Sequence, residues 1–117
     1  MGRQSELVLG NLDAVRDWGH ARDYVRAMWL MLQHSTPEDY VVATGRGRTV
    51  REFVEAAFTA VGLDSSHYVR VTPKYYRPVE PVPFIGNPQK ARQLIGWQAE
   101  TTFEDLVAEM VRSDLQS

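Results

Sequence analysis

The chain has 117 residues, of which 44% are hydrophobic and 24% charged, a composition typical of one ordinary globular domain or less. Its net charge of −2 excludes the broad basic surface of a nucleic-acid-binding domain, so we expect no nucleic-acid partner. No apolar run approaches the roughly 20 residues of a membrane span, so we expect no membrane partner either.

The first third of the chain predicts a short strand at 6–9 and a helix from about His20 to Gln33. Apolar residues of the second segment recur at intervals of three and four, which is the periodicity of an amphipathic helix. We expect the large side chains of this helix to lie in the core: Met28, Trp29 and Met31.

The middle of the chain predicts a second strand and a second helix. Residues 40–44, YVVAT, are β-branched and apolar on both faces, which indicates a strand inside a sheet. After a loop with two glycines, Thr49 and Glu52 have the spacing of a capping box, and Gly62 is placed to end the helix.

The last part predicts a short strand at 67–71, a long irregular segment at 72–88 and two helices. Asn87 and Pro88 are typical of a helix start, and Gly96 of its end. A further helix begins at Thr102. The chain is therefore α/β, with four helices and about three short strands, too few to form an independent sheet.

A charged cluster surrounds Trp18 just before the first helix. Arg16 is its main candidate for binding a ligand, because the planar guanidinium suits phosphate oxygens. The alternative is an ion pair with Asp17 or Asp23, since structural ion pairs are common.

A second candidate site lies in KYYRPVEP, residues 74–81. Arg77 could contact a phosphate, and Glu80 could accept hydrogen bonds from ribose hydroxyls. The alternative is a proline-rich connection with surface tyrosines. In the third candidate, TGRGRT at 44–49, a helix start could bind an anion, but the segment lacks the residues of a P-loop, and we favour a plain turn with a cap.

The sequence gives little support for general-base catalysis by His20 or for metal binding. His20 has no nucleophile beside it in sequence, and a histidine at a helix start more often caps or packs. The three histidines have no metal-ligand spacing, so we expect no metal site. The absence of cysteine excludes disulfides and suits a reducing compartment, so we expect a cytoplasmic location.

Several blocks in colinear order carry a resemblance to a known family: GNLDAVRDWGHARDYVRAMWLMLQ, YVVATG, TVREFVEAAF, KYYRPVE and KARQLIGW. They resemble the GDP-mannose 4,6-dehydratases, which belong to the extended short-chain dehydrogenase/reductases. Those enzymes join an NADP-binding Rossmann domain to a C-terminal sugar-nucleotide domain, and they convert GDP-mannose to GDP-4-keto-6-deoxymannose.

The resemblance implies that residues 1–117 are only the C-terminal, substrate-binding part of such an enzyme, without the Rossmann core. It implies diphosphate contacts for Arg16 and Arg77, ribose contacts for Glu80, and GDP-mannose or a related nucleotide sugar as ligand. No catalytic residue can be carried over, because the glycine-rich loop, the catalytic Thr/Ser and Glu, and the Tyr-xxx-Lys pair have no match here. NADP is therefore expected in the full-length relative and no cofactor in this chain alone.

The resemblance also implies that strand 40–44 would join the missing Rossmann sheet, leaving an exposed edge and apolar surface. We therefore expect a missing Rossmann domain or a homo-oligomer as partner, and an inactive isolated chain. The alternatives are a stand-alone nucleotide-sugar binding or assembly module, or part of another sugar-nucleotide dehydratase or epimerase.

Overall fold

The computed structural model describes residues 6–75 and 85–116, and in this part of the chain it confirms an α/β fold with four helices and a few short strands. In chain order the elements are β1 (Leu7–Leu9), β2 (Val15–Asp17), α1 (Ala21–Gln33), β3 (Gly47–Thr49), α2 (Val50–Ala60), a 3-10 turn (Ser65–His67), β4 (Val69–Val71), a second 3-10 turn (Pro73–Tyr75), α3 (Gln89–Ile95) and α4 (Phe103–Gln116).

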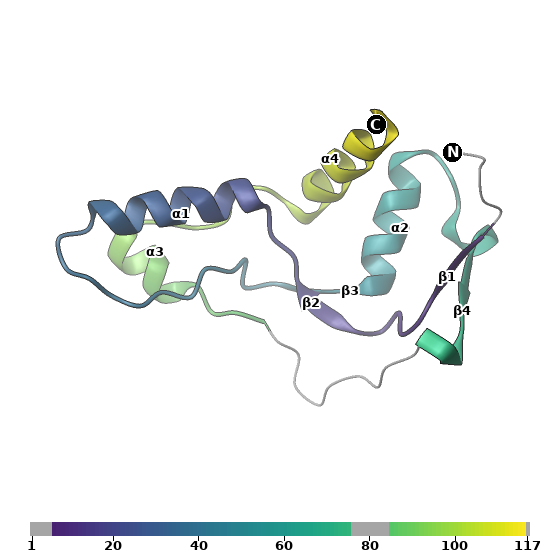
Figure 1. Ribbon diagram of the computed structural model, residues 1–117, viewed down its shortest axis with the longest axis horizontal. Helices are drawn as coiled ribbons and strands as arrows, with labels where there is room; N and C mark the ends of the chain where they lie inside the picture. The colour runs from purple at the N-terminus through teal and green to yellow at the C-terminus, as the bar shows by residue number, and fades with distance from the viewer. Residues whose placement is uncertain (1–5, 76–84, 117) are drawn as a thin grey trace.

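The strands form two separate pairs (Figure 1). β1 and β4, both predicted, lie parallel to each other. β2 and β3 are antiparallel, with Arg16 opposite Arg48. The sequence did not predict β2 or β3, because three-residue strands are too short to show an alternating pattern. The loop at 44–49 is thus partly a strand, and it does end in the expected cap.

The strand predicted at 40–44 is wrong for the described residues, since this segment is irregular. A strand is defined by its hydrogen-bond ladder, and no described strand lies beside this segment. Its β-branched sequence is suited to a sheet, but the sheet is not in the described part of the chain. Val41 is consequently 52% exposed.

The helix termini follow local sequence closely, as predicted. Thr49 and Glu52 form the complete capping box of α2. The Thr102 hydroxyl accepts a hydrogen bond from the Asp105 N–H at the start of α4, 3.1 Å away. Gly96 ends α3 in the left-handed conformation, with a φ of 65°, which favours glycine.

Two small clusters hold the helices together. In the first, α1 packs on α3 through Ala27, Ala91 and Trp97, all fully buried. The Trp97 indole N–H donates to the Asp23 carbonyl of α1 at 2.8 Å. In the second, α2 packs on α4, where Leu106 and Val107 are buried. Figure 1 shows these helix pairs side by side, with β2 and β3 between them.

The molecule is flat and extended. Its extents are 54 × 36 × 17 Å, and its radius of gyration is 17.1 Å. A compact domain of this length would have a radius of gyration of about 13 Å. The chain is therefore considerably more extended than a compact domain of the same length.

One face of α1 is apolar and uncovered. Its large side chains are spaced three and four apart and are 59–82% exposed: Val25, Met28, Trp29 and Leu32. The expectation that Met28 and Trp29 lie in the core is therefore wrong for this structure, although the partly buried Met31 packs against the Ala27 cluster. None of the helices that the structure describes combines the length and the apolar character needed to cross a membrane.

We expect Trp97→Ala to lower the free energy of unfolding by about 3–5 kcal/mol, because it empties a fully buried site and removes the hydrogen bond to Asp23. Urea unfolding followed by circular dichroism measures this change. Trp29→Ala is the matched control and should cost less than about 1 kcal/mol, because that side chain is 59% exposed. Equal losses in the two variants would contradict the assigned core.

Candidate functional site

Arg16, the first predicted site residue, lies on β2 with an exposed side chain. Its Nη1 donates to the neighbouring Val15 carbonyl at 2.8 Å, and within residues 6–75 and 85–116 it forms no ion pair. The alternative of an ion pair with Asp17 or Asp23 is therefore wrong, because both carboxylates bind backbone elsewhere. The guanidinium retains most of its donors for a ligand.

Asp17 anchors the strand that carries Arg16. Its Oδ1 accepts from the Thr44 N–H at 3.0 Å and from the Thr44 hydroxyl at 2.6 Å, while its Oδ2 accepts from the Gly45 N–H at 3.0 Å. Three donors on one carboxylate are a strong, directional connection. They fix β2 against the turn that follows residues 40–44.

Trp18 fixes the other side of the same strand. Its indole N–H donates to the Arg48 carbonyl at 3.1 Å, and the centroid of its ring lies 4.5 Å from the centroid of the Phe53 ring of α2. Such aromatic pairs add stabilisation beyond burial alone. Asp17 and Trp18 together place the backbone of Arg16 rigidly, which lowers the entropy cost of binding a ligand there.

His20 is the N-cap of α1, which agrees with the prediction that a histidine at a helix start more often caps or packs than acts as a general base. Its Nδ1 accepts from the Arg22 N–H at 2.9 Å, so the ring proton is on Nε2, which donates to Glu109 Oε1 at 3.0 Å. This hydrogen bond, with the positive charge of Arg22 nearby, lowers the pKa of the Glu109 carboxyl below its ordinary value. His20 therefore joins α1 to α4, and no described nucleophile is hydrogen-bonded to it.

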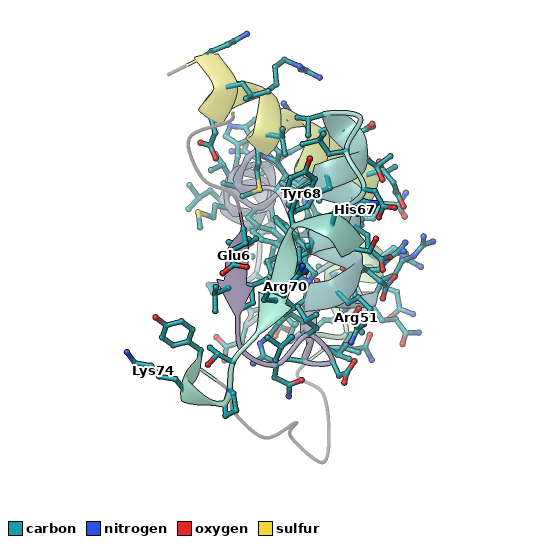
Figure 2. The ribbon with its side chains drawn as sticks, turned by 90° about the vertical axis from the view of Figure 1, so that its right-hand side faces the viewer. Glu6, Arg51, His67, Tyr68, Arg70 and Lys74 are labelled. Atoms are coloured by element: carbon teal, nitrogen blue, oxygen red, sulfur yellow. The ribbon has the colours of Figure 1, made fainter. Side chains whose placement is uncertain are left out.

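The other predicted site residues, Arg77 and Glu80, lie outside the described residues. The chain enters that segment beyond the end of β4, where Figure 2 shows Lys74. It is described again from Ile85, which lies against β2 and β3. A Cβ atom on Gly47 would be 2.6 Å from Ile85 Cδ1 and 2.7 Å from Val15 Cγ1, so a larger residue there would displace these side chains. Glu80 is therefore five positions before a residue that lies beside this strand pair, which carries Arg16.

A cavity of about 310 Å³ lies close to Trp18, and sequence reasoning did not find it. Arg46 and Arg48 line it from the 44–49 segment, and Arg92 from α3. Arg92 is 44 positions from Arg48 and 46 from Arg46, so no local motif indicates that it meets them. Among the residues the structure describes, no group of three histidine or acidic side chains could hold a metal ion.

Parts of larger solved structures have the same fold as this chain. The chain superposes on dTDP-glucose 4,6-dehydratase from Bacillus anthracis with a TM-score of 0.82 and 23% identity, covering 97% of this chain and 35% of that one. It superposes on RMD from Pseudomonas aeruginosa, complexed with NADPH, with a TM-score of 0.81 and 20% identity, covering 92% and 35%. The fold is that of part of an extended short-chain dehydrogenase/reductase.

Sequence relatives identify the family. The family model for GDP-mannose 4,6 dehydratase matches residues 1–110. The chain is 49% identical to GDP-mannose 4,6 dehydratase 2 of Arabidopsis thaliana over 99% of its length, and 47% identical to the Dictyostelium discoideum enzyme over 98%. It covers 31% and 37% of these relatives, about a third of their length. The chain belongs to the GDP-mannose 4,6-dehydratase family.

The lowered pKa of Glu109 predicts a specific loss of stability in acid. A carboxyl whose pKa is lower in the folded state stabilises that state at any pH above the unfolded pKa, and this stabilisation is lost as the pH falls through the lowered pKa of the folded state. Glu109→Gln should therefore flatten the acid limb of the unfolding free energy plotted against pH. Urea unfolding at pH 3 to 6 measures it.

The matched control for this experiment is Glu55→Gln, which changes an exposed glutamate of α2. It should leave the slope of the acid limb at the wild-type value. The assignment fails if Glu109→Gln also leaves that slope unchanged.

Proposed function

We propose that this chain is the substrate-binding region of a GDP-mannose 4,6-dehydratase-like enzyme, and that Arg16 binds the diphosphate of GDP-mannose. One observation carries the proposal: Arg16 is exposed and has no carboxylate partner among the described residues, on a strand that Asp17 and Trp18 hold in place. A guanidinium positioned in advance is suited to phosphate oxygens.

Arg77 and Glu80 complete the proposed site through the family resemblance. Arg77 would give a second phosphate contact, and Glu80 would accept hydrogen bonds from the ribose hydroxyls. The position of Ile85 beside β2 supports this arrangement, because it returns the chain to the strand of Arg16 shortly after Glu80. Two separate cationic groups would orient the diphosphate, and therefore the sugar attached to it.

The start of α2 is not suited to binding a dinucleotide cofactor. In a dinucleotide site, free N–H groups at a helix start bind the pyrophosphate. At the start of α2, by contrast, Thr49 Oγ1 accepts from the Glu52 N–H at 3.0 Å, and Glu52 Oε1 accepts from the Thr49 N–H at 3.0 Å. We infer that NADP binds to the part of the full-length enzyme that this chain does not contain.

The apolar face of α1 supports the proposal that this missing part packs directly on the chain. Val25, Met28, Trp29 and Leu32 form one stripe along the helix, and contiguous apolar patches usually mark interaction surfaces. The irregular segment 40–44 would then become a strand by pairing with the Rossmann sheet. A second copy of the chain is the other possible partner. The same stripe weighs against the alternative of a stand-alone binding module.

We expect Arg16→Ala to weaken the binding of GDP to the chain by about tenfold, because it removes a charge-assisted contact to phosphate. Isothermal titration calorimetry measures the affinity. Arg51→Ala removes the same charge from an exposed arginine that pairs with Asp13 at 3.1 Å, and it should have little effect (Figure 2). Equal affinities in the Arg16 and Arg51 variants, or no heat at millimolar GDP, would exclude the proposed role.

The isolated chain should convert no GDP-mannose when NADP is supplied, because no position in it matches the catalytic residues of the family. The assay follows the appearance of the 4-keto sugar nucleotide by mass spectrometry. A full-length relative assayed at the same concentration is the positive control. Turnover by the isolated chain above a buffer blank would contradict its assignment as a substrate-binding region alone.

A further inference from the structure

The cavity of about 310 Å³ described above is lined by segments that are distant in the chain. They are the 44–48 turn and β3, the start of α3, and residues 98–104, which lead into α4. Arg16 is not among its lining residues. The cavity is therefore a second candidate site, separate in composition from the proposed diphosphate site.

The charges in this cavity do not cancel. Each glutamate that lines it lies near a cation: Glu100 is 3.4 Å from Arg26, and Glu104 is 3.9 Å from Arg48, which it shares with Glu52. Arg46 and Arg92 have no carboxylate within 4.0 Å in residues 6–75 and 85–116. Two guanidinium groups without counter-charges lining one cavity favour a ligand with two negative charges.

Hydroxyl groups of the cavity add uncharged donors. Thr101 Oγ1 accepts from Arg22 Nη2 at 3.2 Å, and Thr102 Oγ1 accepts from the Asp105 N–H at 3.1 Å. A hydroxyl that accepts in this way still has its own proton to donate. These two hydroxyls and the two arginines thus present only donors, which matches an oxyanion. The positive end of the α4 dipole adds to the same preference.

We propose that this cavity binds the phosphoryl dianion of a small phosphorylated molecule. The forked guanidinium groups of Arg46 and Arg92 bind the phosphate oxygens, and Thr101 and Thr102 donate hydrogen bonds to them. A volume near the lower limit of small-molecule sites favours a single phosphoryl group with a small substituent over a whole nucleotide sugar. The site extends beyond the proposed function, because it uses neither Arg16 nor the segment with Arg77.

The test measures the binding of inorganic phosphate to the full 117-residue chain by equilibrium dialysis at fixed ionic strength, so that screening stays constant. The Arg46→Gln/Arg92→Gln variant should weaken binding by about tenfold. The Arg51→Gln/Arg70→Gln variant removes the same charge from two arginines that do not line the cavity, both labelled in Figure 2, and should keep the wild-type affinity. Circular dichroism confirms that both variants are folded.

Three outcomes would overturn the proposal. The first is the absence of measurable binding at phosphate concentrations up to roughly 20 mM, because a site with a weaker affinity would be of little functional interest. The second is an equal loss in the two double variants, which would indicate non-specific attraction. The third is a loss with Arg16→Ala as large as with the Arg46/Arg92 variant, which would place the phosphate at the diphosphate site. Loss of GDP binding in Arg16→Ala with unchanged phosphate binding supports two separate sites.

Discussion

The structure depends on the first turn of α1, where the buried Asp23 holds the chain that leaves α3. Its carbonyl accepts the Trp97 indole N–H at 2.8 Å, and its carboxylate Oδ2 accepts the Thr101 N–H at 2.9 Å. A buried carboxylate is costly unless hydrogen-bonded, so these contacts specify one arrangement. Through them the residues that lead into α4 are fixed beside α1, and the two helix pairs become one unit.

The sequence predicted correctly the features that depend on residues close together in the chain, and it did not predict those that depend on distant residues. The capping box of Thr49 and Glu52 and the glycine stop at Gly96 are local, so residue type and spacing were enough. The pairing of β2 with β3 joins residues about 30 positions apart in three-residue strands, and no local pattern reports it. The segment 40–44 shows the opposite error, because its residues favour a strand but no described strand pairs with it.

The two candidate sites differ in the same respect, because one could be found from the sequence and the other only from the structure. Arg16 could be selected from the sequence because a charged cluster surrounds it, yet sequence alone did not show whether a carboxylate neutralises it. The structure answers this, since Asp17 is engaged by Thr44 and Gly45, and Asp23 by Thr101. Arg92, in contrast, reads as an ordinary helix-surface cation, and only the packing of α3 next to residues 98–104 places it in a cavity.

The thinness of the molecule has a thermodynamic consequence. A helix with its side chains is about 10 Å across. A molecule only 17 Å thick therefore cannot surround any of its helices on all sides. In the structure proposed for the full-length enzyme, the part that covers the apolar face of α1 would supply the burial that this chain lacks. A partner that binds only the folded form adds a stabilisation that grows with the logarithm of its concentration. With the partner proposed above, folding of this chain and its association would be coupled equilibria, and its measured stability would depend on the partner's concentration.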